Sequence, residues 1–297
     1  MKRLLMSGLM VVLLLVSLDW VTGVMGNALL ARVPAVESLQ SSMCQSILHQ
    51  QADVIVLGSS RARHHYSTRM IADSLGMTCY NAGIDGHDML YAYVVFRSMV
   101  ERHCPRVVIL DVCNNQVNGR WKQNSLSDYK CLYGMNRWAT QMVDEQEDLL
   151  LTVKMQSNMY RLNGVWAWLA SSFFRRHDAN NGYVPLEGIV GHPKDVVFEG
   201  FSADEQEVNC VKEMADICRA KGIVFYMAIT PSYEIDEGLS RWFNGFLENH
   251  DVKGCDYTLD GRFRHHRELF KDQGHLNRQG AEKYTSVIVS QIAPLLQ

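Results

Sequence analysis

Short apolar runs alternate with helical patterns along this chain, and that alternation constrains the fold more than any other feature. The runs that read as buried strands are VIVLG at 54–58, TCYNAG at 78–83, RVVILDV at 106–112 and IVFYMAITP at 223–231. Amphipathic helical patterns occupy 66–77 and 87–104, between the first three runs. Strands separated by crossover helices predict parallel βαβ units.

The rest of the chain extends this pattern. A helix is predicted over 203–222, a final edge strand over 254–260 and a C-terminal helix over 278–296. The segment from about 121 to 201 is rich in aromatic and turn-forming residues and lacks strand alternation, so it is predicted to be an inserted helical and aromatic subdomain. The fold class is therefore α/β, a three-layer α/β/α sandwich around a parallel sheet of about five strands.

The first 18 residues, MKRLLMSGLMVVLLLVSL, place Lys2 and Arg3 ahead of an apolar run, as export signals do. Residues 1–26 are predicted to be an uncleaved membrane anchor, with 27–50 as a polar linker and 51–297 as the main domain. Two alternatives stay open, a signal peptide cleaved near Gly23 or Gly26 and a buried core helix. The main domain is expected outside the cytoplasm, on the cell membrane or, after cleavage, secreted or periplasmic.

Composition argues against several classes of function. The 29 basic and 32 acidic residues are well mixed, so no nucleic-acid partner is expected. The sequence has no GxGxxG or Walker loop, which argues against a nucleotide cofactor. It has no HExxH motif, and the adjacent His64 and His65 point in different directions, so no metal is expected. Eight cysteines in an exported chain leave one or more disulfides open, although Cys79 and Cys113 read as buried free thiols.

Ser60 lies where the first predicted strand meets a helix, so it could cap that helix or act as a nucleophile. A nucleophile needs a base, and DQGH near the end of the chain sets Asp272 three residues before His275. At that spacing the carboxylate can accept the imidazole Nδ1 hydrogen and leave Nε2 free as the base. Because the carboxyl ends of parallel strands share one sheet edge, we expect these loops to meet.

Two more loops should end at this edge. Gly83 follows the second strand and would let a backbone N–H approach a substrate oxygen, while Asn114 or Asn115, after the third strand, could offer a side-chain amide. The Ser60 amide at the start of its helix could be a further donor, while the alternative interpretations are a simple turn glycine and loop-capping asparagines. Arg61 could contact substrate or form a structural salt bridge, and the second role is favoured.

These four segments, GSSR, NAG, CNN and DQGH, resemble the Ser, Gly, Asn and Asp-x-x-His blocks of the SGNH, or GDSL-like, hydrolase and acyltransferase superfamily, in the same order. The resemblance spans residues 53–293. It implies a flavodoxin-like parallel sheet, Ser60 as nucleophile, and Asp272 with His275 completing a triad. It also implies an oxyanion hole formed by Ser60, Gly83 and Asn114. The sequence departs from the family pattern in Gly58-Ser59-Ser60 and in DVCNNQ. The Gly-Ser-Ser form resembles membrane-anchored members that acylate cell-envelope polymers.

The function expected from these features is an extracytoplasmic serine esterase or O-acyltransferase that acts on acylated glycans or small esters. Both activities use the same residues, so the sequence leaves hydrolysis and transfer open. The alternative is a catalytically inactive protein of this fold that binds glycan or a partner in an envelope assembly.

Overall fold

The computed structural model describes residues 1–120 and 128–297. The chain divides into two compact units. The sheet unit comprises His49–Ser125 and Asp178–Gln297, and the helical unit comprises Met1–Leu48 and Leu126–His177. The predicted insertion at 121–201 is therefore divided, because its last third belongs to the sheet unit.

A parallel five-stranded sheet is the centre of the sheet unit. Its strands are β1 (Val54–Leu57), β2 (Cys79–Asn81), β3 (Val107–Asp111), β5 (Val224–Ile229) and β7 (Lys253–Asp256). They lie in the order β2-β1-β3-β5-β7, and every pair is parallel. All residues of β1 and β3 are buried, which explains why these strands appear in the sequence as continuous apolar runs. The predicted parallel sheet and its edge strand are confirmed.

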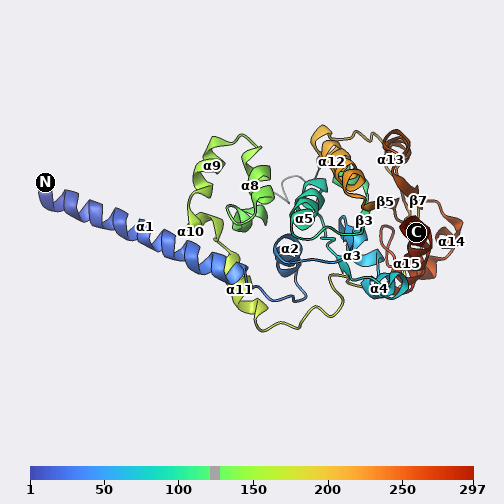
Figure 1. The fold of residues 1–297 in the computed structure, drawn as a ribbon, viewed down its shortest axis with the longest axis horizontal. Coiled ribbons are helices and arrows are strands. Elements are labelled where there is room, and N and C mark those ends of the chain that lie inside the picture. The colour runs from blue at the N-terminus through green and yellow to red at the C-terminus, as the bar shows by residue number, and fades with distance from the viewer. Residues whose placement is uncertain (121–127) are drawn as a thin grey trace. The chain divides into compact units, whose positions relative to one another are not determined.

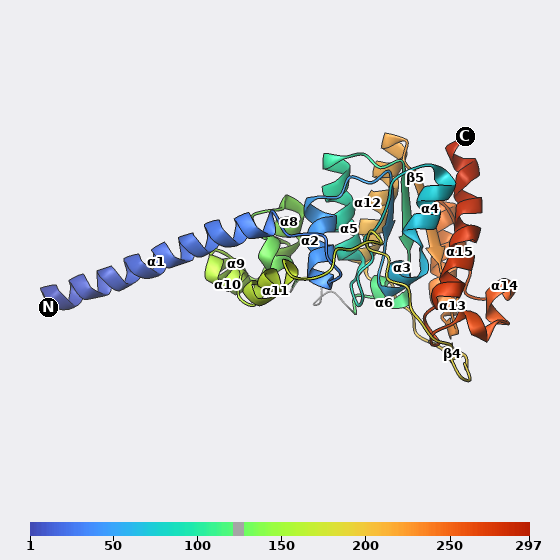
Figure 2. The ribbon, with the colours of Figure 1, turned by 90° about the horizontal axis from the view of Figure 1, so that it is seen from below.

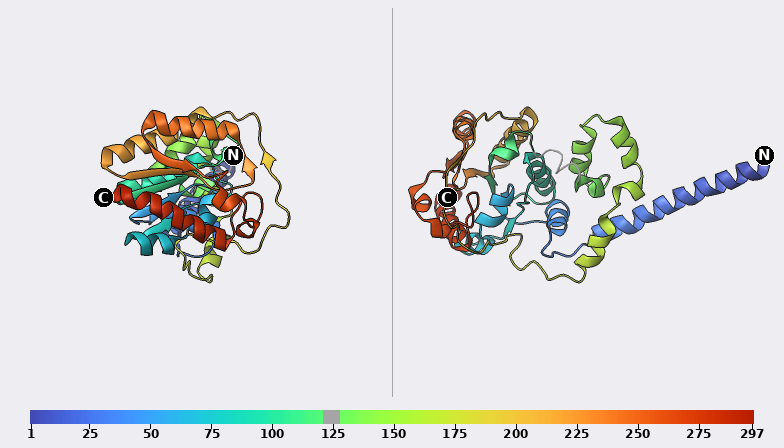
Figure 3. Two further views of the ribbon diagram at one scale, coloured as in Figure 1. Left: turned by 90° about the vertical axis from the view of Figure 1, so that its right-hand side faces the viewer. Right: turned by 180° about the vertical axis from the view of Figure 1, so that it is seen from behind.

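Helices cover both faces of the sheet (Figure 2). On one face α15 (Arg278–Ile292) packs against α3 (Ser60–His65) and α4 (Thr68–Leu75), and on the other α5 (Met89–Arg102) packs against α12 (Glu205–Lys221). Figure 3 shows α15, dark red, running beside the strands. The three-layer α/β/α sandwich is thus confirmed.

The sheet unit also contains a two-stranded sheet and further helices. A short parallel pair joins β4 (Val196–Val197) to β6 (Glu234–Ile235). A helix that the sequence analysis did not predict, α13 (Glu237–His250), follows β6 and packs on β7. The remaining short elements are α6 (Asn114–Val117), α14 (Gly261–Arg264), η2 (Arg267–Leu269) and η3 (Ala293–Leu296).

The helical unit combines the N-terminal segment with part of the insertion. It contains α1 (Lys2–Leu30), α2 (Leu39–Leu48), η1 (Tyr129–Leu132), α8 (Arg137–Asp144), α9 (Leu149–Met155), α10 (Asn158–Arg161) and α11 (Val165–Ser172). Within the range expected as a linker, 27–50, α1 continues to Leu30 and α2 covers residues 39–48. By length and composition α1 is suited to be a membrane anchor or a signal sequence.

The second half of α1 packs on the short helix α10. Asp19 accepts hydrogen bonds from the Ser157 hydroxyl (2.6 Å), from the backbone and side-chain amides of Asn158 (3.0 and 2.9 Å) and from the Met159 amide (2.9 Å). A Cβ on Gly23 would lie 2.5 Å from the Asn158 side chain. These contacts make α1 part of the helical unit rather than a loose leader.

Candidate active site

Ser60 is the first residue of α3, immediately after the turn that ends β1. Gly58 makes this turn possible because its φ is 141° and a Cβ there would lie 2.7 Å from the Asp111 carbonyl oxygen. Ser59 occupies the N-cap position, but its side chain makes no capping bond and lies 3.5 Å from Cys113 Sγ. Ser60 therefore does not cap the helix, and its hydroxyl is turned toward another loop.

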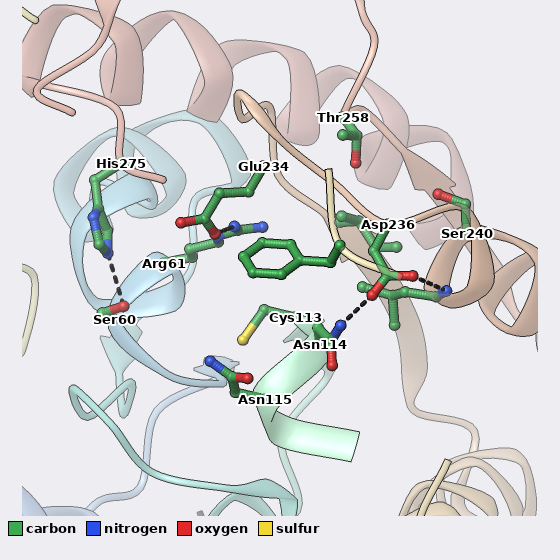
Figure 4. Close-up of a pocket in the computed structure, with 13 residues that line it drawn as sticks. Ser60, Arg61, Cys113, Asn114, Asn115, Glu234, Asp236, Ser240, Thr258 and His275 are labelled. Atoms are coloured by element: carbon green, nitrogen blue, oxygen red, sulfur yellow. Dashed lines mark hydrogen bonds and ion pairs between the residues drawn. The ribbon is translucent and has the colours of Figure 1, made fainter. Parts of the chain in front are cut away.

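That loop brings Asp272 and His275 to Ser60 (Figure 4). The Ser60 Oγ lies 2.8 Å from His275 Nε2, although 215 residues separate them. On the other side of the ring, His275 Nδ1 lies 3.0 Å from Asp272 Oδ1. Desolvation raises the pKa of the Asp272 carboxyl, but hydrogen bonds from the His275 ring and from the Gly274 and His275 amides outweigh it and hold that pKa below its usual value. The carboxylate is thus suited to orient His275 with Nε2 toward the serine.

Two further histidines, for which the sequence predicts no role beside Ser60, lie edge-on to His275. The ring centroids of His64 and His65 are 6.0 and 5.9 Å from that of His275. His65 Nε2 accepts a hydrogen bond from the Leu276 amide (3.0 Å), so α3 fixes the backbone directly after His275. Complete burial holds the pKa of His65 well below its usual value, which keeps the ring neutral and able to accept.

No group of three or more His, Cys, Asp or Glu side chains within 1–120 and 128–297 has an arrangement that could hold a metal ion. His64 is held instead by the Val184 carbonyl (2.5 Å) and by Asp85 (3.2 Å). All eight cysteines are free thiols, and Cys79 and Cys113 are buried as predicted.

A cleft of about 210 Å³ opens beside Ser60 and His275 (Figure 4). Its other lining residues are Arg61, Cys113, Asn114, Asn115, Phe198, Ile229, Glu234, Asp236, Leu239, Ser240 and Thr258. Most of them come from the carboxyl ends of β1, β3, β5 and β7 and from the β4–β6 pair, and Leu239 and Ser240 come from α13. Ligands of open parallel sheets bind at this edge.

Arg61 lies in the cleft wall as an ion-pair partner. Its Nη2 is 2.5 Å from Glu234 Oε2 and donates to the Ser232 hydroxyl at 3.3 Å. The Arg61 side chain is buried, whereas that of Glu234 is 36% exposed. The pair ties α3 to β6, which is the structural role that the sequence analysis favoured for Arg61.

Gly83 does not line the cleft, in contrast to the sequence expectation. Its amide donates to Asn81 Oδ1 at 3.0 Å. A Cβ at this position would lie 2.5 Å from the Arg63 amide and 2.8 Å from the Ala62 Cβ. Glycine is therefore explained here by the close packing of the loop after β2 against α3, and not by a donor aimed at substrate.

The asparagines at the start of α6 are turned in different directions. Asn114, the predicted oxyanion donor, donates a hydrogen bond from its side-chain amide to Asp236. Its side-chain oxygen accepts a hydrogen bond from the Asn118 amide. In Figure 4 the amide nitrogen of Asn115 is turned toward Ser60. No side-chain hydrogen bond of Asn115 occurs in the part of the chain that the structure describes. Asn115 is thus the asparagine whose amide is available to a ligand beside Ser60.

Asp111 is a fully buried carboxyl directly behind this edge of the sheet. Its Oδ2 accepts a hydrogen bond from the Tyr66 hydroxyl at 2.7 Å, and Oδ1 has no hydrogen-bond partner among the described residues. Desolvation outweighs this hydrogen bond and raises the pKa of Asp111 from 3.8 to about 7. The side chain is therefore protonated in mildly acidic solution.

This shift predicts a pH-dependent difference in stability between the wild type and Asp111→Asn. The contribution of Asp111 to the free energy of unfolding is complete below pH 3.8 and is lost as the pH rises to about 7. A pKa shift of about three units corresponds to a change of about 4 kcal/mol in the free energy of unfolding. Between pH 4 and 7 the free energy of unfolding of Asp111→Asn should rise relative to that of the wild type by up to that amount. Urea unfolding at several pH values measures this difference. A difference in free energy of unfolding between the two proteins that does not change with pH would contradict the expectation.

No family model matches the chain, and no curated protein matches it in sequence. Solved structures do match its fold. A lipolytic protein of the G-D-S-L family from Desulfitobacterium hafniense is 11% identical, with a TM-score of 0.42 over 80% of this chain and 97% of that one. An acylhydrolase from Bacteroides fragilis is 12% identical, with a TM-score of 0.44 over 88% of this chain and 98% of that one.

A third structure, described as a platelet activating factor from Streptococcus pneumonia, is 10% identical, with a TM-score of 0.43 over 97% of this chain and 99% of that one. Similarity at this level leaves the roles of individual residues to the geometry of this chain. Its own strand order, β2-β1-β3-β5-β7, is the flavodoxin-like order, and the Ser and Asp-x-x-His segments meet at the carboxyl edge of the sheet.

Proposed function

We propose that this chain is a membrane-anchored serine esterase or O-acyltransferase that uses Ser60, His275 and Asp272. The observation that carries the proposal is the continuous contact from Ser60 Oγ to His275 Nε2 (2.8 Å) and from His275 Nδ1 to Asp272 (3.0 Å) at the mouth of a cleft. A serine, an imidazole base and an orienting carboxylate in this geometry form the machinery of acyl transfer.

In the acylation step His275 Nε2 takes the Ser60 hydroxyl proton while Oγ attacks the ester carbonyl carbon. The tetrahedral intermediate collapses as the C–O bond to the alcohol breaks, and His275 returns the proton to the leaving oxygen. Asp272 stabilises the imidazolium between these transfers. Water or a second hydroxyl then attacks the acyl-serine by the same route, which gives hydrolysis or transfer.

The oxyanion of the intermediate requires donors beside Ser60. The Ser60 amide, at the first turn of α3, is proposed as one of them. Asn115 replaces Asn114 as the second donor, because the Asn114 amide is held by Asp236 whereas that of Asn115 is turned toward Ser60. Gly83 is left out of the oxyanion hole because its amide is bonded to Asn81.

The cleft wall beyond Ser60 supports a hydroxyl-rich substrate such as an acylated glycan. Carboxylates and hydroxyls project from Glu234, Asp236, Ser240 and Thr258, and each can accept a hydrogen bond from a sugar hydroxyl. Phe198, which is 38% exposed, adds an aromatic face beside them. Since a small cleft with this lining suits a short acyl group, small esters such as acetates are the expected substrates.

The direct test is turnover of p-nitrophenyl acetate by the purified full chain, with and without a chito-oligosaccharide acceptor. Release of p-nitrophenol above the buffer rate supports an acyl enzyme, and acetylated oligosaccharide in the products assigns transfer rather than hydrolysis. A chain that binds the oligosaccharide without any turnover would contradict the proposal and favour the inactive binding protein.

The helix α1 is proposed to remain attached as the anchor. A signal peptidase cut near Gly23 or Gly26 would fall inside a continuous helix where both glycines are buried. It would also remove Asp19, whose carboxylate accepts hydrogen bonds from both Ser157 and Asn158. These contacts support an uncleaved helix that spans the membrane once, with the sheet unit outside the cytoplasm.

The mature protein is therefore expected to keep residues 1–30. Intact-mass measurement of the chain purified from membranes should match the full sequence, apart from removal of the initiator methionine. A mass that lacks the first 23 to 26 residues would show cleavage and contradict the anchor.

A further inference from the structure

The helix α9 exposes an apolar face that no part of the described chain covers. Leu149, Leu150 and Val153 are 78%, 62% and 61% exposed, and Met159 at the start of α10 is 50% exposed. Exposing these side chains to water costs free energy, because burying one CH₂ group stabilises a protein by about 0.8 kcal/mol. Several large apolar side chains exposed together on adjoining helices point to an interaction surface.

This apolar surface adjoins the N-terminal helix. A groove is lined by Leu15, Val16 and Trp20 of α1 and by Val153 and Met159. Figure 1 shows α10 beside the second half of α1 and α9 extending away from that contact, within the helical unit. The exposed face of α9 therefore continues the apolar surface of α1 rather than forming a separate patch.

The hydrogen bonds of Asp19 fix the level at which α9 and α10 meet α1. Residues 2–18 precede Asp19 and would span about 25 Å as a helix, close to the hydrocarbon thickness of about 30 Å. Asp19 is the first acidic residue of the helix, and its carboxylate is occupied by Ser157, Asn158 and Met159. A charged residue held by the N-terminus of α10 marks the place where α1 leaves the membrane.

We infer that α9 and the start of α10 rest in the outer headgroup layer of the bilayer that α1 spans, with Leu149, Leu150 and Val153 inserted toward the acyl chains. This inference rests on the proposed membrane placement of α1. Acidic Glu147 and Asp148 directly precede the leucines, so the attraction is apolar rather than ionic and should persist at high salt. The α1–α10 contact would then hold α9 and α10 at the membrane surface.

The test uses photo-cross-linking in the full chain, reconstituted into vesicles of zwitterionic phosphatidylcholine. The cross-linking residue p-benzoylphenylalanine replaces Leu9 of α1, Leu150 of α9 or Leu259 of the sheet unit, one at a time. These three leucines are 61%, 62% and 61% exposed, so they are matched in accessibility. Thermal unfolding of each variant checks that it is folded.

The expected result is lipid adducts at positions 9 and 150, at least tenfold above position 259, at both low and high salt. Adducts at 9 with only background at 150 would overturn the inference while the anchor stands. Lipid adducts at position 9 that do not exceed the background at position 259 would instead refute the membrane anchor. They would also refute the placement of α9 at the membrane surface. Cross-links from 150 to a second copy of the chain in place of lipid would also overturn the inference.

Discussion

Ser60→Ala is expected to abolish covalent labelling of the chain by a fluorophosphonate and to lower kcat for short-chain esters by at least about 10³-fold. The reason is that the reagent and the ester both need the Ser60 oxygen, activated through the 2.8 Å contact with His275. His275→Ala should cause a loss of similar size, because the two residues act as a unit and their effects are not additive. Gel fluorescence and initial rates measure both effects.

Ser59→Ala is the matched control. Ser59 is adjacent, is buried and carries the same hydroxyl, but its Oγ faces Cys113 Sγ and not His275. This variant should keep labelling and most of the turnover, with a small loss of stability. Labelling that survives Ser60→Ala and disappears in Ser59→Ala would contradict the assignment of the nucleophile. Thermal unfolding of all three variants separates lost chemistry from lost folding.

The sheet could be predicted because burial leaves a direct mark on the sequence. Strands covered on both faces, such as Val54–Leu57 and Val107–Asp111, are almost entirely apolar. The end of α4 could also be predicted, because Gly76 has a left-handed conformation (φ 64°) that favours glycine. By contrast, α13 was missed because its sequence, EGLSRWFNGFLENH, holds two glycines and buries only Leu239, Phe243 and Phe246. The helical pattern of this segment is weak, and α13 is stabilised by its packing on β7.

The pairing of Ser60 with the distant Asp272 and His275 was predictable, because a parallel sheet places the loops after its strands at one edge. The choice between Asn114 and Asn115 was not. Adjacent residues at the start of a helix differ by about 100° in direction, and Asp236, which captures the Asn114 amide, lies 122 residues further on. The same limit applies to Gly83, whose packing against α3 depends on a tertiary contact.

The role of the glycines near the end of the predicted anchor depends on tertiary contacts in the same way. In the sequence, Gly23 and Gly26 leave a cleavage site open as an alternative to the anchor. In the structure the glycines are instead positions of close approach, with Leu162 only 2.3 Å from where a Cβ on Gly26 would lie. The partners of Asp19 come from residues 157–159, so only the folded helical unit reveals why the helix continues.

The second large effect is expected at the start of α6, where Asn115→Ala should lower kcat by about 10²- to 10³-fold with little change in KM. An oxyanion donor acts on charge that develops only in the transition state, so its removal slows acylation without weakening substrate binding. Asn115 makes no side-chain hydrogen bond within the described residues, so the loss of its amide should leave the free energy of unfolding nearly unchanged.

Asn114→Ala, one position earlier on the same helix, is the control that separates the two assignments. It breaks the bond to Asp236, which also caps α13 by accepting from the Leu239 amide at 2.9 Å. The expected result is therefore a lower unfolding temperature and a raised KM, with kcat reduced less than about tenfold. If Asn114→Ala reduces kcat by 10²-fold or more and Asn115→Ala does not, then the donor is Asn114, and the contact with Asp236 must open when substrate binds.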